Sequence, residues 1–119
     1  MGRLAGLDML LLTTVGRKTG KKRYTTLLFK KIDGHYYCAG SFGGSPKAPQ
    51  WYRNIFSNPD VEILAEGKFL NATAVILEDD LKAIAWESLI DIYPNFQKYQ
   101  NKTDRVIPVI KFQYNPNRD

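Results

Sequence analysis

Apolar and polar positions form short runs along most of the chain, and turn residues separate the runs. Six runs rich in apolar, aromatic and β-branched residues predict strands over residues 9–15, 24–32, 35–40, 61–65, 69–77 and 106–112. Asp33-Gly34 predicts a hairpin between the second and third of these strands, and Glu66-Gly67-Lys68 predicts another between the fourth and fifth. Pro108 in the last run predicts an edge or bulge position, because proline cannot donate a backbone hydrogen bond.

The apolar spacing becomes helical in two places. Pro49 opens a predicted helix over residues 50–56. Residues 81–92 carry apolar side chains at helical spacing, and we expect Asp79 or Asp80 to cap this second helix. Six strands, mostly in hairpins, with two or three helices predict an α+β domain built on a small antiparallel barrel.

Composition narrows the class of protein. The 119 residues, of which 44% are hydrophobic and 24% charged, are typical of one globular domain spanning residues 1–119. Cys38 is the only cysteine, which excludes a disulfide framework and is consistent with a cytoplasmic protein. The chain has one histidine and no cluster at metal-ligand spacing, so we expect no metal site.

The net charge of +5 is concentrated in one segment. Residues 16–23 (GRKTGKKR) contain five Arg or Lys, and no acidic residue occurs between Asp8 and Asp33. Nearby threonines add hydroxyl donors, and Gly16 and Gly20 allow backbone amides to approach a ligand. Because arginine can bind a phosphate or carboxylate through two parallel hydrogen bonds, this hairpin is predicted to be an anion site.

The basic segment fits three further roles less well. It is not a nucleoside-triphosphate loop, because a strand follows it and Lys22 stands where Ser or Thr is required. A solvated hairpin tip remains an alternative, and so does a single-stranded nucleic-acid surface, although the charges do not form a long stripe. No nucleophile and base pair can be assembled, so an enzyme of this sequence would depend on a cofactor for its chemistry.

Three blocks of the chain, TTVGRKTGKKRYTTL, SFGGSPKAPQWYRNIFSNP and YPNFQKYQNKTDRVIPVIKF, resemble the signature blocks of one family. This is the deazaflavin-dependent nitroreductase and quinone reductase family, whose members are split β-barrel oxidoreductases that use coenzyme F(420), an 8-hydroxy-5-deazaflavin. The blocks occur in the family's order and spacing from about Leu10 to Phe112. The resemblance therefore implies a split barrel with F(420) as cofactor, and FMN is the second candidate.

The resemblance also assigns cofactor contacts. It implies that the basic hairpin and its second strand hold the phosphate and carboxylates of the cofactor tail, through Arg17, Lys18, Thr19, Arg23, Tyr24, Thr25, Thr26, Leu27 and Leu28, with Lys21 and Lys22 reaching the distal carboxylates. It places Ala39, Gly40, Ser41 and Phe42 along the deazaflavin ring. It completes the pocket with Gln50, Trp51, Tyr52, Arg53 and Asn54, and Lys47 is a further expected anion contact.

An aromatic segment is implied to form the acceptor side. Tyr93, Phe96 and Tyr99 match the family's substrate-binding positions, and Ser41, Tyr93 and Tyr99 are the candidate catalytic residues. The resemblance implies that reduced F(420) delivers a hydride to an electron-poor acceptor such as a quinone or a nitro compound. Phe96 and Phe42 replace more polar residues of the family, so a quinone or another apolar acceptor fits better than a nitroimidazole. The family pattern argues against a nucleic-acid partner. It implies membrane contact only through an N-terminal amphipathic segment that this sequence does not show. A non-catalytic flavin-, haem- or lipid-binding barrel is the main alternative.

Overall fold

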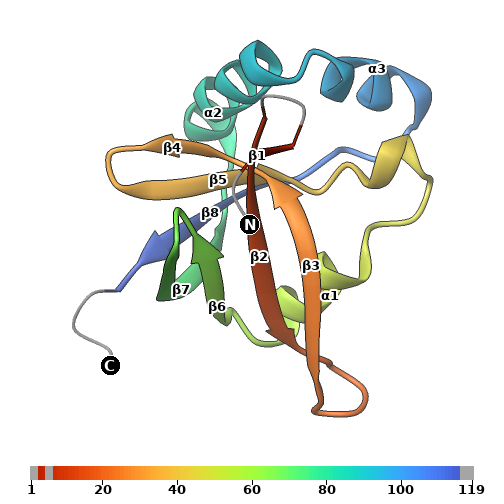
Figure 1. Cartoon of the computed structure of the whole chain (residues 1–119). Coiled ribbons are helices and arrows are strands. Elements are labelled where there is room, and N and C mark those ends of the chain that lie inside the picture. Colours follow the sequence, from red (N-terminus) through yellow and green to blue (C-terminus); the bar gives the residue numbers. More distant parts are fainter. Residues whose placement is uncertain (1–2, 5–6, 116–119) are drawn as a thin grey trace.

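The computed structural model describes residues 3–4 and 7–115 of the chain. Strands and helices account for most of this part (Figure 1). The strands are β1 (Arg3–Leu4), β2 (Leu7–Val15), β3 (Lys22–Leu28), β4 (Lys30–Ile32), β5 (His35–Ala39), β6 (Asp60–Ala65), β7 (Lys68–Ile76) and β8 (Val109–Tyr114). The helical segments are the 3-10 turn η1 (Phe42–Gly44), α1 (Gln50–Ser57), α2 (Asp79–Ile92) and α3 (Asn95–Lys102). The predicted α+β fold on an antiparallel barrel is confirmed.

The order of the strands explains why the sheet curls. The pairing runs β1-β2-β6-β7-β8-β5-β4, and β3 pairs with β2 outside this path. β3 and β4 therefore lie far apart in the pairing order, yet only Phe29 separates them in the sequence. The sheet has to curl until these two strands meet, and the Phe29 N–H donates to the Asp8 carbonyl (3.1 Å) at the junction. The single strand predicted over residues 24–32 is wrong, because the chain changes partner at Phe29, from β2 to β5.

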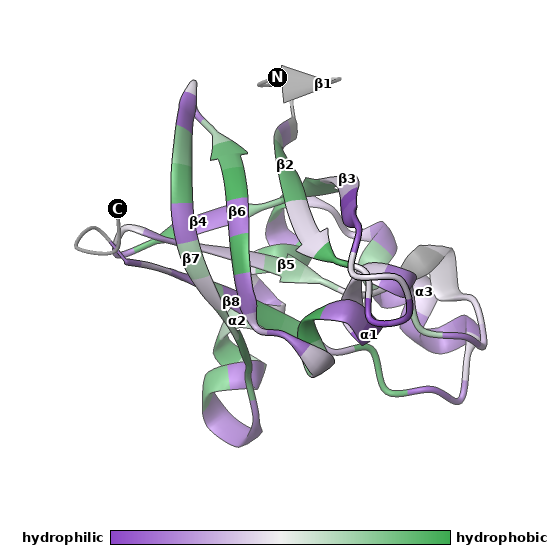
Figure 2. Cartoon of the chain, turned by 90° about the horizontal axis from the view of Figure 1, so that it is seen from below, coloured by the Kyte–Doolittle hydropathy of each residue, from purple (hydrophilic) through white to green (hydrophobic). Residues whose placement is uncertain are grey.

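The hydrophobic core has two parts. The first fills the curled sheet, where Leu10, Leu12, Ile63 and Phe112 are at most 1% exposed. The second lies between the sheet and the helices α2 and α3, around the fully buried Leu89. Burial alternates along β6, as expected for a strand with one face in the core, and Figure 2 shows both hydrophilic and hydrophobic residues on this strand. Burial of this second part holds α2 and α3 over one end of the barrel (Figure 1).

Two predictions at the ends of elements are wrong. The last strand begins at Val109 instead of Val106, and it is an interior strand between β7 and β5. Pro108 lies just before it, since a residue without an N–H cannot take part in pairing on both sides. α2 begins at Asp79 with Glu78 at the N-cap position, and no side chain caps it. The aspartates lie instead in the first turn, where negative charge complements the helix dipole.

Among the described residues, no helix has the length and apolar character needed to span a membrane.

Candidate active site

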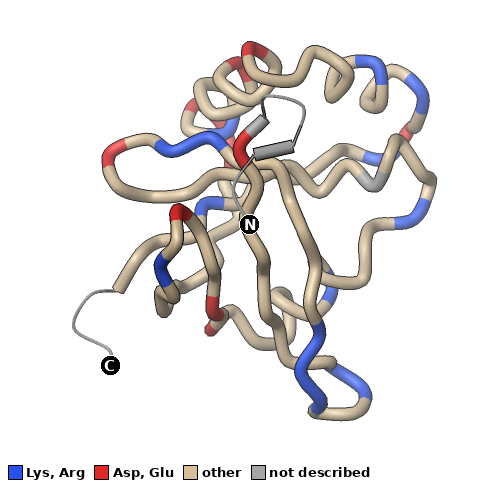
Figure 3. The backbone as a smooth tube through the Cα atoms, in the orientation of Figure 1, with Lys and Arg blue, Asp and Glu red and all other residues tan. Residues whose placement is uncertain are grey.

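The basic hairpin, residues 16–23, projects from the barrel between β2 and β3. The Gly16 N–H donates to the Lys21 carbonyl (2.7 Å), and the Gly20 N–H donates back to the Gly16 carbonyl (2.8 Å). Gly20 has a positive φ of 71°, which a residue with a side chain rarely adopts. This turn gathers Lys and Arg at one end of the molecule, whereas Asp and Glu lie mainly on α2 and on the other hairpins (Figure 3). Within the described chain, no carboxylate forms a salt bridge with these cations.

Helix α1 holds one of the cations in place before any ligand arrives. Asn54 is 4% exposed, and its Oδ1 accepts hydrogen bonds from the Arg17 backbone N–H (3.2 Å) and from Arg17 Nη1 (3.1 Å). Its Nδ2 donates to the buried Thr14 Oγ1 (3.2 Å). Gln50, one helical turn earlier, accepts from Arg17 Nη1 (2.8 Å). All these acceptors are neutral, so the charge of Arg17 stays available for an anion.

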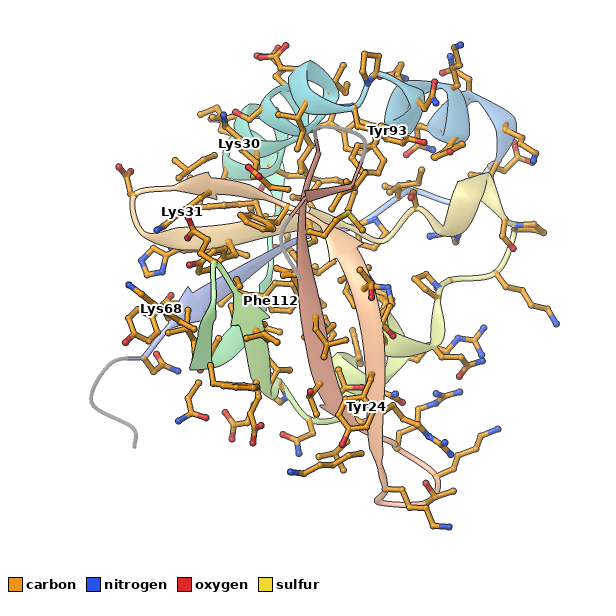
Figure 4. All side chains as sticks on the ribbon, viewed as in Figure 1. Tyr24, Lys30, Lys31, Lys68, Tyr93 and Phe112 are labelled. Carbon is orange, nitrogen blue, oxygen red and sulfur yellow. The ribbon has the colours of Figure 1, made fainter. Side chains whose placement is uncertain are left out.

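Two adjoining pockets lie along β3 and α1. The first, which we call the basic pocket, has a volume of about 570 Å³ and is lined by Gly16, Arg17, Lys18, Thr19, Lys22, Arg23, Tyr24, Thr25, Gln50, Trp51 and Asn54. The second, the aromatic pocket, has a volume of about 460 Å³ and is lined by Met9, Thr25, Thr26, Leu27, Leu28, Ala39, Ser41, Gly43, Pro49, Gln50, Trp51, Tyr93, Phe96 and Tyr99. Thr25, Gln50 and Trp51 border both, so the two form one groove that is cationic at one end and apolar at the other. Figure 4 shows Tyr24 and Tyr93 at its opposite ends.

Three aromatic residues form the wall of the aromatic pocket beneath α2 and α3. The Phe96 ring lies 5.0 Å from the Tyr93 ring and 6.4 Å from the Tyr99 ring. The Tyr93 and Tyr99 hydroxyls are hydrogen-bonded to each other (3.1 Å). The hydrogen bond from Tyr99 lowers the pKa of Tyr93, with a smaller effect from Asn95, and the same bond raises the pKa of Tyr99. Tyr93 is thus the more acidic of the two tyrosines, and both line the pocket.

The floor of the aromatic pocket is the loop that follows β5. Ser41 is 8% exposed and lines the pocket, and its hydroxyl has no hydrogen-bond partner in the described part of the chain. Arg105 binds the back of this loop through three backbone carbonyls, those of Gly40 (3.0 Å), Ser41 (2.9 Å) and Ser45 (3.1 Å). Burial lowers the pKa of Arg105, which nevertheless stays far above neutrality because guanidinium is so basic.

Most predicted site residues line one of the two pockets, and five do not. Lys21, Gly40, Lys47, Tyr52 and Arg53 line neither, and nothing is described of the Phe42 side chain. Tyr52 borders a different cavity, lined also by residues of α2 and by Pro108, and its contact with the cofactor stays a prediction. Because consecutive residues of a helix point about 100° apart, Gln50 and Trp51 border the groove and the next residue, Tyr52, does not.

Sequence reasoning missed four residues of this region, Met9, Gly43, Pro49 and Arg105. Pro49 was considered only as a helix start, although it also lines the aromatic pocket. Met9 belongs to a continuous apolar run, and such a run does not show which side chains face the core and which face the pocket. Arg105 lies in the third resembling block, but a lone arginine after a helix gives no signal that it binds carbonyls more than 60 residues away.

Comparison with known proteins identifies the family of this chain. The family model described as F(420)H(2)-dependent quinone reductase matches residues 1–113. An F(420)H(2)-dependent quinone reductase of Mycobacterium tuberculosis is 38% identical over 104 residues, covering 85% of this chain and 70% of that protein. A solved F(420)-H(2)-dependent reductase has a TM-score of 0.82 at 40% identity, covering 88% of this chain and 93% of the other. A chain described as a domain-swapped dimer has the same score and identity, covering 88% of this chain and 79% of its own. The chain therefore belongs to the F(420)H(2)-dependent quinone reductase family.

Proposed function

We propose that this protein is an oxidoreductase in which reduced coenzyme F(420) reduces a quinone. The observation that supports this most strongly is the continuity of the groove at Trp51, which joins a cationic end to an apolar one. A cofactor with an anionic tail and a flat conjugated ring needs this combination. A nucleic acid would instead need cations along the whole groove, and the aromatic pocket has none among its lining residues.

The residues fit the cofactor at both ends. At the tail end, Arg17, Lys18 and Arg23 face the basic pocket without carboxylate partners, so a phosphate and several carboxylates would supply the missing negative charge. At the ring end, the pocket is lined by Ala39 and Gly43, whose small size leaves room for a flat ring. The pocket volume is within the usual range of about 300–1,000 Å³ for small-molecule sites. When bound there, reduced F(420) supplies a hydride to the acceptor.

The protein contributes orientation and exclusion of water. Trp51, 6% exposed and packed against Phe112, provides a rigid edge where the two pockets meet. The free hydroxyl of Ser41 is available to orient the ring or the acceptor. Tyr93 and Tyr99 shape the acceptor side, and their shared hydrogen bond gives that wall a polar group that can donate a proton.

A quinone fits the acceptor wall better than a nitro compound does. Phe96 is 5% exposed and sits between the two tyrosines, so the centre of the wall offers an apolar surface and no hydroxyl. The Mycobacterium tuberculosis relative is named a quinone reductase, which supports the same acceptor class for this chain. The location that we propose is the cytoplasm.

The experiment is a titration of the purified protein with oxidised F(420), followed by turnover of F(420)H(2) with menadione as a soluble quinone. Trp51 borders the ring end, so we expect its fluorescence to be quenched on binding, and Trp51→Phe should remove most of that change. Trp86→Phe is the matched control, because Trp86 on α2 lines neither pocket. Quenching that follows Trp86 would contradict the placement, and binding without menadione turnover would favour a non-catalytic module.

A further inference from the structure

Arg105 lies outside both pockets, yet it holds the loop that forms the floor of one of them. Its Nε, Nη1 and Nη2 donate to the carbonyls of Ser45, Gly40 and Ser41, at 2.9–3.1 Å. Three donors of one rigid planar group thus fix three carbonyls of a six-residue loop. Lysine could not reproduce this arrangement, because its ammonium is a point charge without a planar fork.

The backbone of Arg105 is in turn held by α3, the helix that carries Phe96 and Tyr99. Gln100 Nε2 donates to the Arg105 carbonyl (2.8 Å), and Gln100 Oε1 accepts from the Ile107 N–H (2.9 Å). The Arg105 N–H donates to Thr103 Oγ1 (3.2 Å). Gln100 therefore fixes the segment after α3 to the helix at two points, and the Thr103 bond lies within that segment, so the guanidinium extends from a restrained backbone.

The loop and α3 also touch directly. Gly44 has a positive φ of 78°, and a Cβ at this position would lie 2.8 Å from the Tyr99 carbonyl oxygen. Only glycine fits this approach. The floor with Ser41 and the acceptor wall with Tyr99 are consequently joined twice, once at this contact and once through Gln100 and Arg105.

We infer that Arg105 is a positioning residue, which sets the height and tilt of the Ser41 floor relative to the Tyr93–Tyr99 wall. This inference rests on the proposed function, because it concerns the geometry in which the ring and acceptor meet. Ser41 Oγ has no side-chain or backbone partner within the described chain, so its direction depends on the backbone that Arg105 holds. The guanidinium also forms no salt bridge there, so its charge acts on the loop carbonyls alone.

The test compares Arg105→Lys and Arg105→Met with wild type, and uses Tyr36→Phe as the control. Tyr36 is buried on β5 and donates to Glu66 (2.8 Å), so its replacement removes a hydrogen bond away from both pockets. Four quantities are measured: the melting temperature, the Kd of complete oxidised F(420), the Kd of a tail-less 8-hydroxy-5-deazaflavin, and kcat and KM with menadione.

We expect Arg105→Lys to raise the Kd of the tail-less ring by about tenfold, because hydrogen bonds from a charged donor are lost. Misplacement of the floor by about 1 Å should lower kcat by up to about a hundredfold. The salt dependence of binding of the complete cofactor should stay as in wild type, since the basic hairpin is untouched. Arg105→Met should show the same pattern more strongly, and Tyr36→Phe should lower only the melting temperature.

Three outcomes would overturn the inference. Arg105→Lys with wild-type ring affinity and kcat, at a lower melting temperature, would show that Arg105 only stabilises the fold. Equal losses of kcat in Tyr36→Phe would show general loosening of the barrel. A wild-type protein that binds neither form of the deazaflavin would refute the proposed function itself, and the inference with it.

Discussion

At the scale of single residues, Arg17 and Arg23 differ in how they are prepared for a ligand. Arg17 is restrained by Gln50 and Asn54, so little side-chain freedom remains to be lost on binding. Arg23 is exposed, lines the same pocket and has no hydrogen-bond acceptor among the described residues. One cation is thus pre-oriented, and the other is free to adapt to the anion.

Charge reversal of Arg23 should abolish cofactor binding without unfolding the protein. One charge-assisted hydrogen bond contributes about 1.5–3 kcal/mol, which corresponds to about ten to a hundredfold in Kd, and repulsion adds to the loss. Lys30→Glu is the control, because it makes the same charge change on β4, well away from the basic hairpin (Figure 4). The measurements are the melting temperature and the Kd of oxidised F(420). Arg23→Glu that melts normally and binds like wild type would show that the tail lies elsewhere.

Asn54 is the residue that links α1 to β2 and to the hairpin. Asn54→Ala leaves the buried Thr14 hydroxyl without its partner, and we expect a loss of about 1–3 kcal/mol of folding stability. It also frees Arg17, so the Kd of F(420) should rise several-fold. Urea unfolding and a binding titration measure the two effects. Asn58→Ala, at the far end of α1, should leave the Kd unchanged, and a loss of stability in Asn54→Ala with no change in Kd would refute the link.

At the scale of elements, the break between α2 and α3 forms the wall of the aromatic pocket. Pro94 separates the two helices, and Tyr93 at the end of α2 meets Phe96 and Tyr99 on α3. The resemblance implied that these side chains line one side of the site, and in the structure all three line the aromatic pocket. Their mutual contacts make the wall one unit, so a change at one ring alters its neighbours.

The tyrosine pair predicts how this wall titrates. When Tyr93 ionises, only the Tyr99 hydroxyl can donate in the hydrogen bond that the two share, so this bond stabilises the Tyr93 phenolate and lowers the pKa of Tyr93. Tyr99→Phe removes that donor, so the pKa of Tyr93 should rise. With rising pH, Tyr93 should therefore ionise earlier in wild type than in the variant. NMR of ¹³C-labelled tyrosine measures this, and Tyr114→Phe on β8 is the control. A Tyr93 titration that Tyr99→Phe leaves unchanged would mean that the two hydroxyls do not interact in solution.

At the scale of the whole molecule, the basic hairpin is a concentration of positive charge at one end. Acidic residues lie on α2, on β6 and at the other hairpin tips, and further Lys and Arg are distributed over the rest of the molecule (Figure 3). Such a distribution attracts an anionic ligand towards one end and accelerates its approach. The cationic end belongs to a hairpin that leaves the barrel, and the apolar end is covered by α2 and α3 (Figure 1).

Salt should weaken binding of the complete cofactor and leave the ring almost unaffected. The Debye length falls from about 30 Å at 0.01 M to about 8 Å at 0.15 M ionic strength, which screens the exposed cations of the hairpin. We expect the Kd of F(420) to rise steeply over this range, whereas the Kd of a tail-less deazaflavin should stay nearly constant. Equal salt dependence for both ligands would contradict the division of the groove into an ionic end and an apolar end.

The amino-acid sequence alone was sufficient to predict the features that depend on residues close together in the chain. The basic hairpin, the turn at Asp33-Gly34 and the two amphipathic helices follow from spacing within about ten residues, and the structure contains all of them. The aromatic wall was predictable for the same reason, because Tyr93, Phe96 and Tyr99 lie within one short segment. The free energies of turn and helix formation depend mainly on residues close in sequence, so short sequence patterns can predict these elements.

Tertiary structure decided the features that depend on contacts between distant segments. The split of residues 24–32 at Phe29 follows from barrel closure. β8 is an interior strand because it pairs with β5 on one side and with β7 on the other. Arg105 reaches carbonyls 60 to 65 residues away, and Tyr52 turns from the groove while Trp51 faces it. No spacing encodes these outcomes, because they arise when the curled sheet brings separate parts of the chain together and packing selects the side chains that fit.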